Sequence, residues 1–190
     1  MRPPRLRPPA EPAVPDVRIV PLAPEVLHAL AAGDRDAANA RTTLELPAMF
    51  VAPGWVSTWR FRSVQVGEDP TSAAWITGAV VDVATGQVVG KAGFHGPPDG
   101  AGMVEVGYAV LPELRRRGYA RAALGALLRR AAAEERVRVV RASISPENVA
   151  SLALVTQYGF VQVGEQWDEE DGRELVLEVL VGRPGLAGSR

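Results

Sequence analysis

The residues with the clearest chemical potential lie where a predicted strand leads into a predicted helix. Three consecutive arginines, Arg115, Arg116 and Arg117, stand directly before Gly118, and an apolar helical pattern follows. The first turn of a helix has backbone N–H groups without intrahelical acceptors, and the helix dipole adds partial positive charge there. A glycine allows a tight turn and a close approach to a phosphate. The junction predicts a binding site for a phosphate-bearing ligand; a solvated basic turn that caps the helix is the alternative.

The two commonest phosphate-binding motifs are absent from the chain. The sequence contains neither the GxxxxGK[ST] loop of nucleoside triphosphatases nor the GxGxxG fingerprint of dinucleotide-binding proteins. The predicted anion site therefore belongs to another class.

The elements around this junction follow from hydrophobic periodicity. The strand before it spans Met103–Val110, and a helix from Gly118 to about Glu135 carries apolar residues at helical spacing. The chain then continues with a strand at Val137–Ser143, a helix from Pro146 to about Tyr158, and two strands at Phe160–Trp167 and Arg173–Leu180. Asp168–Gly172 is an acidic turn between the last two strands.

The N-terminal half has a similar mixture of helices and strands. The predicted elements are a strand at Arg18–Leu22, a helix from Pro24 to about Ala32, a second helix capped by Asp34, and a hairpin of Trp75–Val83 and Val88–His95. The stretch Pro47–Ser63 fits neither pattern clearly. Strands and helices in this order predict an α/β or α+β sandwich with a mixed sheet.

Composition limits the classes of function. The 190 residues are 47% hydrophobic, which suits one domain, and the net charge of −1 gives no reason to expect binding to nucleic acid or an anionic membrane. There is no cysteine, and two histidines are too few for a multi-histidine metal centre, so we predict no metal. Without an apolar signal core or a long apolar run, we expect a cytoplasmic protein.

The two ends of the chain differ in composition from the rest. Residues 1–16 are rich in proline and arginine and predict a disordered tail, and residues 182–190 predict a flexible one. The folded domain is expected over residues 17–181.

Two spaced motifs resemble those of the GNAT superfamily of acetyl-CoA-dependent N-acetyltransferases, in particular the branch that includes ribosomal-protein N-terminal acetyltransferases. Arg115-x-x-Gly118-x-Ala120 is similar to the family's [Q/R]-x-x-G-x-[G/A] pyrophosphate loop. Asn148-x-x-Ser151, followed by Gly159-Phe160, is similar to its N-x-x-S…G-F segment. The resemblance covers roughly Arg18 to Leu180.

The resemblance implies a fold and a cofactor site. It implies a mostly antiparallel central sheet flanked by helices, in which the strand at Glu105–Val110 splays from Val137–Ser143 so that pantetheine enters the gap. The residues that it implies for acetyl-CoA binding are Ala109, Val110, Arg115, Arg116, Arg117, Gly118, Tyr119, Ala120, Asn148 and Ser151. Asn148 is also a good candidate for an ordinary helix N-cap.

The implied reaction needs a neutral amine to attack a thioester. An amine with a pKa near ~10.4 is neutral in only about one molecule in a thousand at pH 7, so a general base helps. We expect Glu105 to be this catalytic base, on a strand face that Gly107 and Ala109 keep open. His95 is the rival base, and a surface-facing glutamate is the simpler interpretation of Glu105.

One position departs from the family pattern. Many members carry a tyrosine four residues before the glycine of the G-F pair, where it protonates the departing thiolate; here that position is Val155. Tyr158 is three residues further along the helix and should point elsewhere. Whether a general acid exists is therefore open; because a thiol with a pKa near ~8.5 is a good leaving group, water can suffice.

The acceptor is less defined than the cofactor. The resemblance implies an acceptor surface from residues 24–59 and Asp168–Gly172, and a small-molecule or peptide amine as the partner. A non-catalytic acyl-CoA-binding domain and a transferase of another acyl group are the alternatives. Exposed outer strands are also compatible with a homodimer.

Overall fold

The computed structural model describes residues 14–169 and 172–181 and contains a seven-stranded sheet within them. Its strand order is β1-β2-β3-β4-β5-β7-β6, and every neighbouring pair is antiparallel except β4 and β5, which are parallel. The strands are β1 (Val17–Val20), β2 (Gly78–Asp82), β3 (Val88–Phe94), β4 (Met103–Val110), β5 (Val139–Ile144), β6 (Val161–Asp168) and β7 (Gly172–Leu180). The expected mixed, mostly antiparallel sheet is confirmed.

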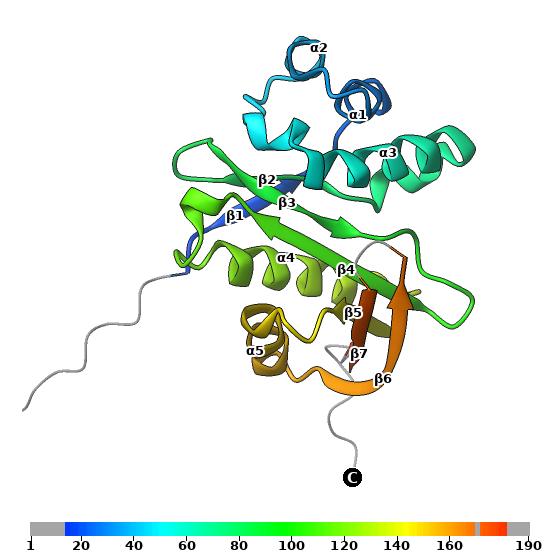
Figure 1. Cartoon of the computed structure of the whole chain (residues 1–190). Helices are drawn as coiled ribbons and strands as arrows, with labels where there is room; N and C mark the ends of the chain where they lie inside the picture. The colour runs from blue at the N-terminus through cyan, green and yellow to red at the C-terminus, as the bar shows by residue number, and fades with distance from the viewer. Residues whose placement is uncertain (1–13, 170–171, 182–190) are drawn as a thin grey trace, which may run out of the picture.

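Helices cover both faces of the sheet. The α-helices are α1 (Pro24–Ala31), α2 (Arg35–Asn39), α3 (Pro53–Glu68), α4 (Tyr119–Ala133) and α5 (Val149–Gln157), with 3-10 turns η1 (Ala48–Val51), η2 (Pro70–Ala74) and η3 (Pro112–Leu114). Figure 1 shows α1, α2 and α3 on one side of the sheet and α4 and α5 on the other. The described part of the chain is therefore a three-layer α/β structure, in which the sheet lies between two layers of helices.

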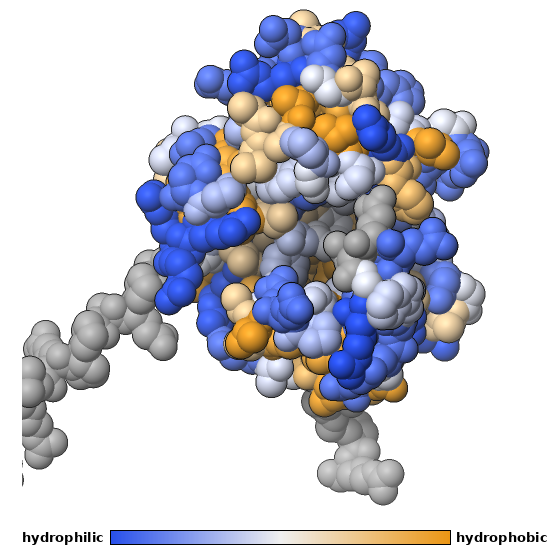
Figure 2. Space-filling model, in the orientation of Figure 1, coloured by the Kyte–Doolittle hydropathy of each residue, from blue (hydrophilic) through white to orange (hydrophobic). Residues whose placement is uncertain are grey.

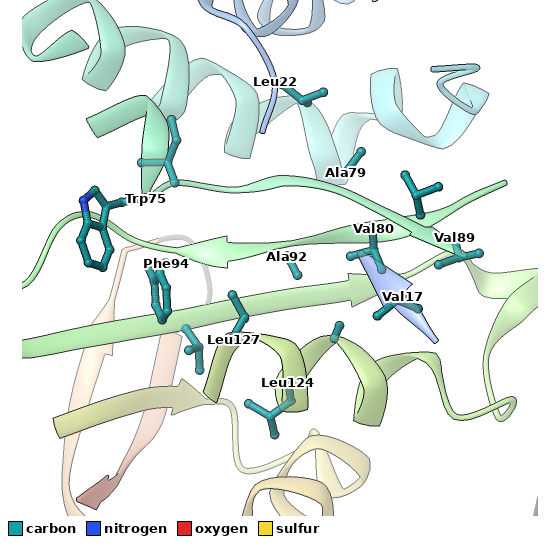
Figure 3. Close-up of a cluster of buried hydrophobic side chains, with 14 of the residues drawn as sticks. Val17, Leu22, Trp75, Ala79, Val80, Val89, Ala92, Phe94, Leu124 and Leu127 are labelled. Atoms are coloured by element: carbon teal, nitrogen blue, oxygen red, sulfur yellow. The ribbon is translucent and has the colours of Figure 1, made fainter. Parts of the chain in front are cut away.

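The core forms where the apolar stripe of α4 meets the sheet. Leu124 and Leu127 on α4 are fully buried, and on the sheet the ring of Phe94 in β3 lies 5.7 Å from the ring of Trp75 (Figure 3). Burying a leucine contributes about 1.5–3 kcal/mol, so this stripe fixes the axis of α4. The position of the first turn of α4 follows from that axis.

Strands β4 and β5 diverge soon after they meet. Their parallel pairing extends only over Met103–Glu105 and Val139–Arg141 in the described part of the chain. Each strand is still paired on its other side, β4 with β3 and β5 with β7. The expected splayed pair is confirmed, and it leaves two inner strand edges facing a gap.

Several boundaries differ from the sequence prediction. β2 begins at Gly78 rather than Trp75, because η2 and the turn after it precede the strand. α5 begins at Val149 rather than near Pro146, since Asn148 caps it. The ambiguous stretch forms η1 and α3, where Trp59 donates a hydrogen bond of 2.7 Å to the carbonyl of Phe50.

The predicted tails lie mostly outside the described residues. Residues 1–13 and 182–190 are not described, but Val14–Asp16, which the sequence assigns to the tail, lead directly into β1. The carbonyl of Asp16 accepts a hydrogen bond from Val83, and Pro15 packs beside Gly118. Residues 15 and 16 therefore contact the folded part directly before β1 begins at Val17.

Candidate active site

A groove of about 710 Å³ runs from the end of β4 past the first turn of α4 to α5. Its walls contain nine of the ten residues that the sequence predicted for the cofactor: Ala109, Val110, Arg115, Arg116, Gly118, Tyr119, Ala120, Asn148 and Ser151. Arg117, the tenth, is exposed and does not line the groove. Ligand pockets commonly have volumes of ~300–1,000 Å³, so the groove is large enough for a cofactor.

The loop before α4 has the backbone geometry of an anion site. Gly118 has φ 88° and Arg116 has φ 63°, so both lie in the left-handed region. The N-cap residue of α4 is Gly118, which has no side chain to bond the first-turn N–H groups, and this leaves them for a ligand. A Cβ at Gly118 would lie 2.9 Å from Cδ of Pro15, so glycine is required by both conformation and space.

A hydrogen bond ties the first turn of α4 to the far end of the β2–β3 hairpin. The hydroxyl of Tyr119 donates to Oδ2 of Asp82 at 2.8 Å. This bond lowers the pKa of Asp82, as do hydrogen bonds from Thr85 and Ala84, and it raises the pKa of Tyr119. The Tyr119 hydroxyl therefore positions the loop, while the rest of the residue lines the groove.

Asn148 has the N-cap geometry that the sequence offered as its simpler interpretation. Its Oδ1 accepts the backbone N–H of Ser151 at 3.1 Å, which orients the start of α5 toward the groove. The cap occupies the oxygen and leaves the amide N–H₂ as a donor toward a ligand.

A second hollow of about 410 Å³ lies on the other side of the β4–β5 gap. Its walls include Glu105 and His95, and from β6 and β7 the residues Gln166, Asp168 and Glu174. It shares three residues with the groove: Tyr108, Asn148 and Ser151. The gap between the splayed strands therefore joins the two hollows.

Glu105 and His95 form the titratable centre of the second hollow. Oε1 of Glu105 lies 3.8 Å from Nδ1 of His95, and the Glu105 side chain is 19% exposed. Although 49% of the imidazole surface is exposed, the ring lies against the wall of the hollow, and this burial lowers its pKa below the ordinary 6.5. Glu105 and Asp168 oppose the shift and Arg62 reinforces it. The net direction keeps His95 neutral near pH 7.

Arg62 supports the segment that carries His95. The guanidinium is buried in α3 and donates to the carbonyl of His95 and to Oε1 of Gln65, both at 2.9 Å. Burial lowers its pKa to about 10, which the charge of Glu105 partly offsets. Arg62 therefore stays cationic at neutral pH and fixes the backbone beside the hollow.

The space above Gly107 is smaller than the sequence suggested. A Cβ at this position would meet Nε2 of His95 at 3.0 Å, so the imidazole occupies the room that the missing side chain provides. The open face expected over Gly107 and Ala109 is therefore partly filled by the rival base itself.

The lining of the second hollow overlaps only in part with the surface that the resemblance implies for the acceptor. No residue of the stretch 24–59 lines the second hollow, whereas Asp168 from the expected acidic turn does. Residues 170–171 of that turn lie outside the described residues. The N-terminal region reaches the hollow only indirectly, through Arg62 and Gln65 behind His95.

The position of the family's tyrosine is unavailable to a ligand in this chain. Val155 is fully buried in the core. Tyr158 points away from both hollows, and its hydroxyl donates to the carbonyl of Arg121 at 3.1 Å. The expectation that Tyr158 points elsewhere is confirmed.

Two buried hydroxyl groups near the gap were not predicted. Tyr108 on β4 and Ser143 on β5 both have a buried hydroxyl oxygen without a well-formed hydrogen bond to the described residues. Burial raises the pKa of Tyr108, and the neighbouring Ser151 hydroxyl partly offsets this. Strand periodicity in the sequence could have indicated that Tyr108 faces away from Glu105. It could not have indicated that the Tyr108 and Ser143 hydroxyl groups lie near the same gap.

The described residues contain no cluster of three or more His, Cys, Asp or Glu side chains arranged to hold a metal ion. None of the helices in the described ranges combines the length and apolar character that a membrane span needs.

Hydrophilic and hydrophobic residues are interspersed over the face shown in Figure 2.

Comparison with known proteins shows which protein family this chain belongs to. The family model described as acetyltransferase (GNAT) domain matches residues 16–161. The chain belongs to this family, which confirms the resemblance seen in its motifs.

Individual relatives agree with this assignment. The chain is 32% identical over 103 residues to the uncharacterized N-acetyltransferase YjdG of Bacillus subtilis (strain 168), a match that covers 53% of this chain and 60% of that protein. The match thus spans less than two thirds of the relative's length.

Solved structures share the fold at low identity. Ribosomal-protein-S5-alanine acetyltransferase from Vibrio fischeri is similar with a TM-score of 0.58 and 17% identity, over 87% of this chain and 92% of that one. The Microcin C7 self-immunity acetyltransferase MccE, solved with acetyl-CoA and AMP, gives a TM-score of 0.59 and 12% identity, over 87% and 93%.

Proposed function

We propose that this chain is an N-acetyltransferase that moves the acetyl group of acetyl-CoA to a primary amine by direct attack in a ternary complex. The observation that carries the proposal is that the anion-binding groove and the Glu105–His95 hollow open into the same β4–β5 gap. A gap between two otherwise paired strands suits a ligand whose own amides complete the broken ladder. The pantetheine chain of coenzyme A carries such amides.

The groove residues fit the phosphate end of acetyl-CoA. The first-turn N–H groups of α4 and the side chains of Arg115 and Arg116 provide donors and positive charge. Ala109 and Val110 at the end of β4, and Asn148 before α5, also line the groove. Bound there, acetyl-CoA would supply an activated acyl group as a thioester.

The second hollow suits the amine. Glu105 is partly buried beside a neutral imidazole, so its carboxylate can take the proton that the amine must lose, directly or through one water. We assign His95 to positioning this carboxylate and the amine.

The acceptor chemistry follows from the lining. Three carboxylates, Glu105, Asp168 and Glu174, line the second hollow with His95 and Tyr108, and no lysine or arginine lines it among the described residues. This charge attracts an ammonium group before it loses its proton. A small cationic amine or a peptide N-terminus is therefore the proposed acceptor class.

The test is CoA release from acetyl-CoA in the presence of a panel of polyamines, aminosugars, amino acids and N-terminal peptides. The proposal expects release that depends on one amine class, with the acetylated amine identified by mass spectrometry. Release with a longer acyl donor and not with acetyl-CoA would move the chain to another acyl transfer. Tight acetyl-CoA binding with no turnover across the panel would favour a non-catalytic acyl-CoA-binding domain.

A further inference from the structure

We infer that Tyr108 is a further catalytic residue, whose hydroxyl donates a hydrogen bond to the sulfur that leaves as coenzyme A. The inference rests on the proposed function. Glu105 is proposed to take the proton of the amine, whereas Tyr108 would stabilise the departing thiolate. The inference concerns the leaving group, for which the usual tyrosine position holds the buried Val155.

The placement of Tyr108 supports this role. It is one of three residues that line both the groove and the second hollow, so it lies where a thioester and an amine would meet. By strand alternation its side chain leaves β4 on the face opposite to Glu105. A base on one face and a hydrogen-bond donor on the other suit an amine that attacks from one side while sulfur departs toward the other.

The Tyr108 hydroxyl lacks a hydrogen-bond partner of normal geometry. Its oxygen is buried and makes no such bond with the described residues, although the Ser151 hydroxyl lies close enough to affect its pKa. A buried hydroxyl without a hydrogen-bond partner is destabilising, and a ligand atom in the gap would remove this cost. The raised pKa of Tyr108 keeps the phenol protonated, and thus a donor, throughout the neutral range.

The reaction balances without any further reagent. The nitrogen lone pair of the amine forms the new C–N bond, and the C–S bond breaks with its electron pair going to sulfur. The proton lost by nitrogen goes to Glu105 and then to solvent. The developing thiolate is stabilised by the Tyr108 O–H group and finally takes a proton from solvent, giving the amide and free coenzyme A.

The other two tyrosines do not compete for this role. The hydroxyl of Tyr119 is bonded to Asp82, and that of Tyr158 is bonded to the carbonyl of Arg121. Tyr158 lines neither hollow. Tyr158→Phe is therefore a matched control, because it removes one half-buried hydroxyl outside the proposed site.

The experiment compares the binding of coenzyme A and desulfo-CoA to the wild type, Tyr108→Phe and Tyr158→Phe by calorimetry. At pH 9 most of the free thiol, with a pKa near ~8.5, is thiolate. A hydrogen bond to a charged partner is worth about a factor of ten or more, so Tyr108→Phe should weaken CoA binding about tenfold. Desulfo-CoA should bind equally to all three proteins, and kcat should fall only in Tyr108→Phe.

Equal losses for CoA and desulfo-CoA in Tyr108→Phe would assign the residue a structural role and overturn the inference, as would no loss for either. If Tyr108→Phe does not fold, the wild type alone decides. Its affinity for CoA relative to desulfo-CoA should rise from pH 7 to pH 9, and a constant ratio would contradict the inference. A wild type that binds neither ligand would refute the proposed function itself.

Discussion

Oε1 of Glu105 lies 3.8 Å from Nδ1 of His95, although the two residues come from different strand ends and face one hollow together. The pair is held from behind by Arg62, whose guanidinium bonds to the His95 carbonyl. Two candidate bases that the sequence presents as rivals are thus neighbours in one site. Their separate contributions can be measured by single substitutions.

Replacing Glu105 by Gln should lower kcat/KM for the amine by about 10²-fold, since general-base catalysis commonly contributes 10²–10⁴-fold. The dissociation constant for acetyl-CoA should stay the same, because Glu105 lines the second hollow and not the groove. Steady-state kinetics and calorimetry on the same preparation measure both quantities. A larger loss in His95→Asn than in Glu105→Gln would reverse the two roles.

Gly107→Ala should disturb the acceptor side without affecting the cofactor side. The new Cβ would lie 3.0 Å from Nε2 of His95, so the half-exposed imidazole would have to shift by a few tenths of an ångström, which changes its position relative to Glu105. We expect KM for the amine to rise several-fold, while the unfolding midpoint and the acetyl-CoA affinity change little. Gly100→Ala is the control, since a Cβ there would meet nothing within 4 Å. Unchanged amine kinetics would place the amine away from His95.

The arginines before α4 should differ in their effect on coenzyme A. Arg116 lines the groove, whereas the adjacent Arg117 does not. We expect Arg116→Ala to weaken acetyl-CoA binding about tenfold at low salt, because a charge-assisted hydrogen bond is lost. Arg117→Ala should have a smaller effect that salt removes, since only long-range charge changes. Similar losses in both variants would mean that the loop acts through its net charge alone.

Tyr119→Phe should lower the free energy of unfolding by about 1 kcal/mol at pH 7, because the hydrogen bond to Asp82 is lost. The pKa of Asp82 is lowered in the folded protein, so its contribution to stability is present above its ordinary pKa of 3.8 and is lost as the pH falls through the folded value. The difference between variant and wild type should therefore shrink as the pH falls below about 3.8. Urea unfolding across pH measures it, and a difference that is independent of pH would argue against ionised Asp82 as the acceptor.

Much of the groove could be predicted because it depends on local sequence. The bounds of β4 are those expected from its apolar pattern, and Gly118 occupies the left-handed position that a strand-to-helix turn requires. The motif at Arg115–Ala120 needs only the strand before it and the helix after it. These are short-range relationships, which periodicity and turn chemistry describe well.

The rest of the site depends on contacts between distant segments. α3 was ambiguous because Arg62 occupies a buried position on the helix, and its partners, Thr77 and His95, are 15 and 33 residues away. The importance of Tyr108 appears only when α5 and β5 are placed beside β4. The resemblance implied residues 24–59 and Asp168–Gly172 for the acceptor surface. Asp168 does line the second hollow, but nothing in the local pattern of residues 24–59 shows that they do not.

All the roles proposed above depend on the binding of acetyl-CoA at the β4–β5 gap and at the turn before α4. A calorimetric titration of the wild-type chain with acetyl-CoA, and with NAD as a second phosphate-rich ligand, tests this binding. We expect saturable binding of one acetyl-CoA per chain and no comparable binding of NAD. Equal binding of both ligands, or no binding of acetyl-CoA, would mean that the motif is only a basic helix cap and that the proposed cofactor site is wrong.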